Sequence, residues 1–211
     1  MTSIDNSLAM ARYRVRAPHY DEATRRMEPV RQHAIERLDL RPGDRVLDLG
    51  CGTGKSFGPI LERIGAQGQL VGVDQSPDML AIARWRVADA GWSNVTLIES
   101  AAEQAGLEGR FDALLLVYTP DVLRSRAALA RAFGATRPGA RITCAGMKFF
   151  PWWLMPLNLL VLIKAWGYAG KLAAYRRPWR FLAPHVERLA VEAMYGGIAF
   201  VASGRSRGVA P

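Results

Sequence analysis

The stretch Val46-Leu47-Asp48-Leu49-Gly50-Cys51-Gly52-Thr53-Gly54-Lys55 decides the fold of this 211-residue chain. It joins an apolar strand that ends in an acidic residue to three glycines spaced by two. Glycine bares the backbone and tolerates left-handed turns, and the N-terminus of a following helix presents free N–H groups to a ligand. The pattern predicts a strand-to-helix loop that holds a small ligand carrying both a cation and polar hydroxyls.

Two other glycine-rich ligand loops do not fit this stretch. The dinucleotide fingerprint G-x-G-x-x-G needs a third glycine where the chain has Lys55 or Phe57, depending on the register. The phosphate-binding loop G-x-x-x-x-G-K-[ST] needs its first glycine where the chain has Leu49. A tight turn without a ligand remains as an alternative, although three glycines would then cost backbone entropy for no gain in binding.

A second apolar run, residues 70–73, also ends in an acidic residue, Asp74, which lies 24 residues beyond Gly50. Dinucleotide-binding folds place an acid about 20 residues after their glycines, where it accepts hydrogen bonds from the ribose hydroxyls. Asp74 stands in a similar position and is a candidate ligand-binding acid. The alternative is a solvated carboxylate beside a helix cap at Ser76.

The two acidic strand ends and the glycine loop resemble class I S-adenosylmethionine-dependent methyltransferases, in the branch that methylates quinone precursors and bacterial phospholipids. The family's motif I, D/E-x-G-x-G-x-G, is complete in this chain, and the resemblance covers roughly residues 30–204. It implies S-adenosyl-L-methionine as cofactor and S-adenosyl-L-homocysteine as product. The implied cofactor-binding residues are Asp48, Gly50, Cys51, Gly52, Gly54, Asp74, Gln75, Met79, Ser100, Ala101, Ala102 and Tyr118.

The loop after the third expected strand departs from the family. Its members usually carry an acid there, in a pattern like G-D-A, that binds the adenine amino group. This chain has Ala101 at the position of the acid, between Ser100 and Ala102. Adenine contacts from the backbone of Ala101 and Ala102, or from the Ser100 side chain, are the expected replacement.

Strands and helices alternate along the chain. Strands are expected at residues 45–49, 69–73, 95–99, 111–118 and 140–146, and helices at 21–40, 56–64, 77–90 and 121–136, the last two capped by Ser76 and Asp121. The runs 186–195 and 198–203, joined by two glycines, predict a hairpin. Together with the resemblance, this predicts an α/β fold in a single domain, residues 1–211. Its core is a Rossmann-like doubly wound sheet of seven strands, mostly parallel, with an antiparallel C-terminal strand.

The acceptor is expected beyond the fourth strand. Ligands of open α/β sheets lie at the carboxyl ends of the strands, so Tyr118 and Thr119 are expected to face it, with Tyr118 as a candidate catalytic residue. The motif N-P-P-Y or D-P-P-Y is missing here, which argues against methylation of a base or amide nitrogen by that route. No metal site is expected.

Two further segments are expected to cover the site. Residues 1–25 resemble the N-terminal lid of quinone-biosynthesis methyltransferases, with His19 as a candidate general base or a surface histidine, and Tyr20 as a substrate contact. Residues 149–180 are expected to form a helical insertion over the acceptor, with Trp152 and Trp153 contacting it. Their uncharged run is too short and too interrupted by proline to span a membrane. It suits a lid, a helix at the lipid headgroups or a core helix.

Composition limits the partners. Twenty-eight lysines and arginines against 19 acidic residues give a net charge of +9, which favours anionic partners or reflects a solvated basic surface. The two distant cysteines suggest neither a disulfide framework nor a metal site. The N-terminus has no secretory signal pattern, so a cytoplasmic location is expected, with peripheral membrane contact left open.

The sequence thus predicts an S-adenosylmethionine-dependent methyltransferase for a small lipophilic acceptor, such as a quinone precursor or a lipid. An RNA methyltransferase is the first alternative, suggested by the charge. Nucleic acid is disfavoured because the aromatic residues lie in an apolar run and are not interleaved with basic residues. The second alternative is a non-catalytic cofactor-binding or membrane-associated protein. The acceptor atom and the oligomeric state are not given by the sequence.

Overall fold

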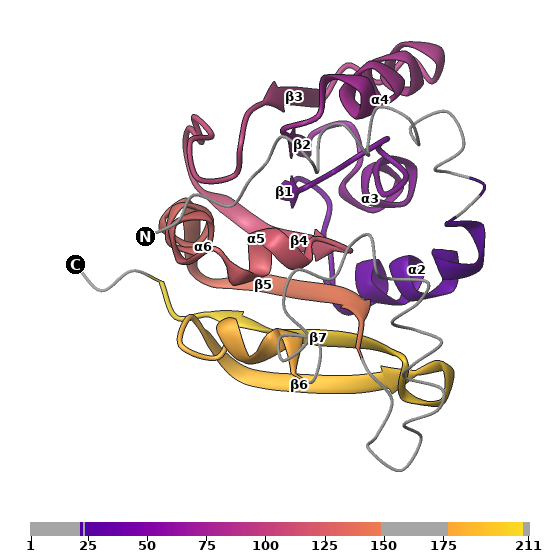
Figure 1. Ribbon diagram of the computed structural model, residues 1–211. Coiled ribbons are helices and arrows are strands. Elements are labelled where there is room, and N and C mark those ends of the chain that lie inside the picture. Colours follow the sequence, from indigo (N-terminus) through magenta and orange to yellow (C-terminus); the bar gives the residue numbers. More distant parts are fainter. Residues whose placement is uncertain (1–21, 23, 149–176, 209–211) are drawn as a thin grey trace.

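A single seven-stranded sheet organises the chain (Figure 1). The computed structural model describes residues 22, 24–148 and 177–208. The strand order is β3-β2-β1-β4-β5-β7-β6. Strands β1 to β5 are parallel, whereas β7 runs antiparallel to both β5 and β6. The predicted fold class is therefore confirmed. The strands are β1 (Arg45–Leu49), β2 (Gln69–Asp74), β3 (Val95–Glu99), β4 (Phe111–Val117), β5 (Thr136–Met147), β6 (Val186–Met194) and β7 (Ala199–Ser206).

Helices cover both faces of the sheet because alternate strand residues point to opposite sides. In β4, Leu114 and Leu116 join the apolar cluster that also holds α5 and α6, whereas Leu115 and Val117 join the cluster that holds α2, α3 and α4. Burial on both faces explains why β4 is apolar almost throughout. The helices are α2 (Glu28–Arg37), α3 (Phe57–Ile64), α4 (Pro77–Asp89), α5 (Pro120–Arg124) and α6 (Arg126–Gly134), with short 3-10 turns η1 (Arg25–Met27), η4 (Pro178–Phe181) and η5 (Tyr195–Gly197).

The helix expected at 121–136 is in fact two helices. Ser125 has an extended backbone and accepts a hydrogen bond from the Ala128 amide across 3.2 Å, so it ends α5 and caps α6. The predicted cap at Asp121 is wrong. Thr119 occupies the N-cap position of α5, because Pro120 follows as the first helical residue, where its fixed φ is suitable.

Two turns behave differently in the sheet. The strand expected at residues 140–146 begins earlier, at Thr136, and residues 137–140 form a bulge in it. The pairing with β4 jumps from Thr136 to Arg141 while β4 advances from Phe111 to Ala113. The predicted hairpin between β6 and β7 is confirmed, and its two glycines have φ values of +63° and +99°.

No helix of the described residues is long and apolar enough to cross a bilayer.

Most of the two covering segments lies outside the described residues. The expected N-terminal lid, residues 1–25, is described only at residues 22, 24 and 25, and the expected insertion, residues 149–180, only from residue 177. The helix expected at 21–40 is described as η1 followed by α2.

Candidate cofactor and acceptor site

The glycine loop between β1 and α3 takes a left-handed path. Gly50, Gly52 and Gly54 have φ values of +80°, +56° and +77°, a region that is strained for residues with side chains. A side-chain carbon added at Gly50 would collide with Thr119, whereas one at Gly52 would meet nothing within 4 Å. The loop is therefore packed closely against Thr119 at one glycine and open at the next.

Asp74, at the carboxyl end of β2, links this loop to the next one. Its carboxylate accepts hydrogen bonds from the Gly52 amide and from the Ser76 amide, each across 2.9 Å. Burial raises the pKa of Asp74, and these amide bonds oppose the rise. A carboxylate offers about four acceptor positions, so Asp74 can still accept bonds from the hydroxyls of a ligand. The predicted Ser76 cap is confirmed, since its hydroxyl accepts from the Met79 amide at 3.4 Å.

Asp48 is almost completely buried, with 2% of its surface exposed, and no described residue bonds its Oδ2 atom. Burial raises the pKa of Asp48 to about 7, and the charge of Asp74 adds to the rise. The positive charge of Arg31 and a hydrogen bond from Ser56 act in the opposite direction. A buried acceptor atom without a partner is rare in folded proteins and calls for an explanation such as a ligand or ion.

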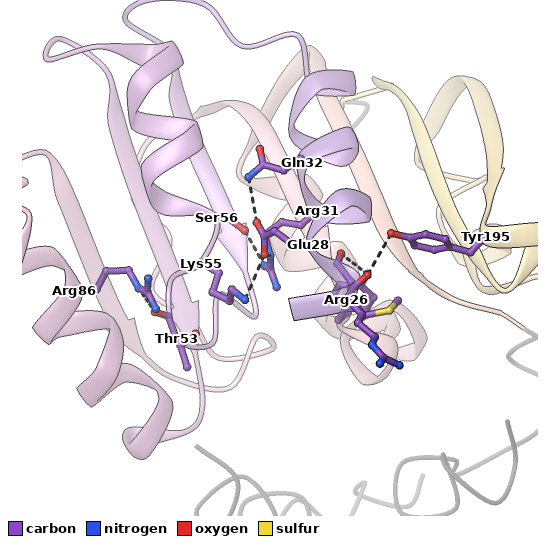
Figure 2. A network of polar contacts seen from close by, with 11 residues as sticks. Arg26, Glu28, Arg31, Gln32, Thr53, Lys55, Ser56, Arg86 and Tyr195 are labelled. Carbon is purple, nitrogen blue, oxygen red and sulfur yellow. Dashed lines mark hydrogen bonds and ion pairs between the residues drawn. The ribbon is translucent and has the colours of Figure 1, made fainter. Parts of the chain in front are cut away.

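Side chains of α2 form a polar network with the end of the loop, as Figure 2 shows. The guanidinium of Arg31 donates to the Ser56 hydroxyl at 3.1 Å, and Glu28 lies 3.5 Å from Arg31 and 3.4 Å from the ammonium of Lys55. From the opposite side, Arg86 of α4 donates to the carbonyl of Thr53 at 3.0 Å (Figure 2). Two helices thus hold the loop in place.

The sequence alone did not predict this network, although it carried one signal of it. Arg31 lies four residues before Ile35 and directly after Val30, so it occupies the apolar stripe of its helix. A charged residue on such a stripe is rarely buried unless it is paired. The stripe therefore indicated a buried arginine but not its partner.

Tyr118 and Thr119 follow β4 beside this loop. Tyr118 has a φ of +59°, and its hydroxyl donates to the Met27 carbonyl at 3.2 Å, so it joins the acceptor side of the sheet to η1. The guanidinium of Arg31 lies 5.9 Å from the centre of the Tyr118 ring. The Oγ1 atom of Thr119 is buried without a partner among the described residues. Thr119 therefore packs against Gly50 of the loop, and Tyr118 lies next to it at the carboxyl end of β4.

A second tyrosine holds the same turn. The hydroxyl of Tyr195, from the β6–β7 hairpin, donates to the Arg26 carbonyl at 3.2 Å (Figure 2). Two consecutive carbonyls of η1 are thereby bound to distant parts of the sheet. The start of α2 is fixed relative to the site by these bonds.

Some of the remaining predicted site residues are described by the structure, and others lie outside the described residues. The Cys51 thiol is buried and its pKa raised by burial, and the side chain of Met79 is also buried. In the loop after β3, the Ser100 hydroxyl donates to the Ala101 carbonyl at 3.0 Å. Gln75 and Ala102 are partly exposed, and Ala102 packs against the core. Outside the described residues lie His19, Tyr20, Trp152 and Trp153.

The described residues fit S-adenosylmethionine. The ligand has sulfonium and ammonium cations and two ribose hydroxyls. The site offers two buried acceptor atoms that no described residue bonds, Asp48 Oδ2 and Thr119 Oγ1, together with an accepting carboxylate at Asp74 and open space at Gly52. No metal is needed for methyl transfer from a sulfonium.

Comparisons with known proteins agree with this geometry. A methyltransferase-domain family matches residues 46–139. The aklanonic acid methyltransferase DauC of Streptomyces sp. (strain C5) is 33% identical over 126 residues, which cover 57% of this chain and 56% of that protein. The demethylmenaquinone methyltransferase of Shouchella clausii is 29% identical over 119 residues, covering 54% of this chain and 49% of that protein. The chain thus matches about half the length of these relatives.

Solved structures extend the likeness of the fold. A SAM dependent methyltransferase from Aquifex aeolicus superposes with a TM-score of 0.63 at 17% identity, covering 92% of this chain and 98% of that one. Residues 46–139 thus match a methyltransferase domain, and the described sheet has the fold of S-adenosylmethionine-dependent methyltransferases.

Proposed function

We propose that this protein transfers the methyl group of S-adenosylmethionine to a small lipophilic acceptor. The observation that carries the proposal is a pair of buried acceptor atoms next to the open glycine loop, Asp48 Oδ2 and Thr119 Oγ1, which have no hydrogen-bond partner among the described residues. The cofactor supplies a methyl group on a positively charged sulfur. The chain's own task is to align the acceptor with that methyl group and to exclude water.

Each side chain of the site has a role in this proposal. Asp74 accepts bonds from the ribose hydroxyls while it holds the Gly52 amide, and Asp48 provides negative charge for the cationic end of the cofactor. Tyr118 and Thr119 border the acceptor. Ser100 and the backbone of the following two alanines take over adenine binding from the family's missing acid.

Residues beyond the described ranges complete the proposed site. His19 and Tyr20 belong to the lid, with His19 as a candidate general base, and Trp152 and Trp153 contact the acceptor from the insertion. The names of the two relatives, aklanonic acid methyltransferase and demethylmenaquinone methyltransferase, support a small organic acceptor. We place the protein in the cytoplasm, in reversible contact with a membrane.

Titration calorimetry with S-adenosylmethionine and S-adenosylhomocysteine tests cofactor binding. Asp74→Ala is expected to abolish binding, because both the ribose acceptor and the anchor of the Gly52 amide are lost. Asp89→Ala, an exposed position at the end of α4, removes the same charge and is expected to bind normally. Micromolar binding by Asp74→Ala would overturn the assignment of this site.

The acceptor class is tested by methyl release against a lipid and quinone-precursor extract and, in parallel, against RNA. Turnover with the extract alone is the expected result. Turnover with RNA alone would replace the lipophilic acceptor by nucleic acid. Cofactor binding without turnover on either would favour a protein that keeps the fold without the chemistry.

A further inference from the structure

The net positive charge of the chain comes from one stretch of sequence. Between Asp121 and Glu187 there are eleven lysines and arginines and no aspartate or glutamate. The rest of the chain holds the other 17 of the 28 basic residues against all 19 acidic ones. The charge is therefore segregated, although basic residues occur throughout the sequence.

Three of these cations are already bound within the protein. Arg131 donates to the Ala105 carbonyl, Arg137 pairs with Asp112, and Arg141 pairs with Asp44. Five more lie in the described part of the stretch, and none of them forms an ion pair with another described residue. These five are Arg124, Arg126, Lys148, Arg177 and Arg180.

These five cations lie on α5, at the start of α6, in and beside η4, and just after β5. Helix α5, which begins at the acceptor side of the site, contacts both α6 and η4. Lys148 follows the carboxyl end of β5, and its ammonium lies 5.8 Å from the centre of the Trp179 ring in η4. The one acidic residue on these described elements is Asp121. We call these five side chains the basic surface.

We propose that the basic surface docks the protein onto a membrane that contains anionic phospholipids. The inference rests on the proposed function, since a lipophilic acceptor is held in such a membrane. A basic surface gains roughly 1 kcal/mol per lysine or arginine close to anionic headgroups. Because the surface borders the acceptor side, docking would present the site to the bilayer.

Two observations favour lipid over nucleic acid as the partner. Single-stranded nucleic acid binding uses exposed aromatic rings for base stacking, whereas Trp179 and Phe181 pack against the core, and Trp179 lies 5.1 Å from the Phe200 ring. In addition, Lys148 is followed in the sequence by an uncharged run that includes Trp152 and Trp153. Basic residues next to tryptophan and aliphatic residues are typical of segments that bind lipid headgroups.

Co-sedimentation with vesicles tests the proposal. The full chain is expected to bind vesicles of equimolar phosphatidylcholine and phosphatidylglycerol, to bind phosphatidylcholine alone much more weakly, and to dissociate at high salt. The double variant Arg124→Gln/Arg180→Gln is expected to bind the anionic vesicles about thirtyfold more weakly, because each lost charge weakens binding about fivefold.

A matched double variant controls for net charge. Arg41→Gln/Arg84→Gln removes two exposed cations remote from the basic surface, where the side chains are 68% and 51% exposed. It is expected to keep vesicle binding within about twofold of the parent protein, because Arg41 precedes the amino end of β1 and Arg84 lies on α4, and neither belongs to the basic surface. Equal losses in the two double variants would overturn the docking surface.

Two further readouts separate this inference from the proposed function. Both double variants are expected to bind S-adenosylmethionine like the parent in calorimetry and to unfold at the same temperature. Normal cofactor binding with no affinity for anionic vesicles would overturn the docking and leave the methyltransferase proposal intact. Tighter binding of polyuridylate than of anionic vesicles would assign the surface to RNA instead.

Discussion

Arg31 on α2 donates a hydrogen bond across 3.1 Å to the hydroxyl of Ser56, at the end of the motif I loop. Its positive charge also opposes the rise in the pKa of Asp48 that burial causes. Arg31 and Asp48 are both nearly excluded from solvent, at 6% and 2% exposure. One arginine therefore couples the N-terminal helix to the charge of the motif I acid.

Arg31→Met is expected to destabilise the protein by about 2 kcal/mol, because a charged hydrogen bond is lost and buried polar groups are left unpaired. Cofactor affinity falls with it, since Asp48 then holds its proton more strongly. Arg37→Met on the same helix is the control. Arg37 is half exposed and pairs with Glu192, so its loss is expected to cost less than about 1 kcal/mol. Urea denaturation measures both, and equal losses would contradict the coupling.

The pH dependence of stability follows from Asp48. Its pKa in the folded protein, about 7, lies above its ordinary value of 3.8, so the unfolded chain releases this proton first as pH rises. The contribution of Asp48 to the free energy of unfolding is therefore expected to fall between about pH 4 and pH 7 and to remain constant above that range. The difference between parent and Asp48→Asn, measured by denaturation across this range, isolates the effect. A difference independent of pH would show that Asp48 titrates normally.

Gly52→Ala is expected to fold and to lose cofactor binding. The added methyl group meets no protein atom within 4 Å, so the main penalty is about 1 kcal/mol for a left-handed alanine, while the methyl group occupies space in the ligand loop. Gly43→Ala, in the turn before β1, has a similar φ of +84° and equally open surroundings. It is expected to show the same shift in stability with unchanged calorimetric affinity. Loss of affinity in both variants would point to a general effect of strain.

Thr119→Val tests whether the Thr119 hydroxyl serves a ligand. Because its Oγ1 atom is buried without a partner in the described structure, an apolar group of the same shape is expected to stabilise the protein by about 1 kcal/mol. The hydroxyl of Thr143, in the middle of β5, is likewise buried without a hydrogen-bond partner among the described residues. Thr143→Val is expected to gain similar stability with no change in ligand affinity, whereas Thr119→Val loses affinity. Unchanged binding of cofactor and acceptor by Thr119→Val would exclude this role.

Local features of the fold could be predicted because their causes are local. The bounds expected for β1 and β3 agree with the structure, since strand length follows from an apolar run between turn residues. The Ser76 cap could be recognised because Pro77 directly follows it. The division of residues 121–136 into two helices could not, because the extended backbone of Ser125 interrupts a periodic pattern that continues beyond it.

In the candidate site, too, the local features could be predicted from the sequence, whereas the contacts between distant residues could not. Motif I and Asp74 could be recognised because glycine spacing and an acidic strand end are readable along the chain. The bonds from Arg31 to Ser56 and from Tyr118 to Met27 join residues 25 and 91 positions apart, and no local pattern specifies such partners.

The sequence by itself determined the class of fold, the cofactor loop and the absence of acidic residues between Asp121 and Glu187. Only the tertiary structure decided that α2 places Arg31 against the motif I loop and that η4 lies beside α5 near the acceptor side. The reason is physical. Periodicity and turn chemistry act over a few residues, whereas the contacts between distant elements depend on how both faces of the sheet are packed.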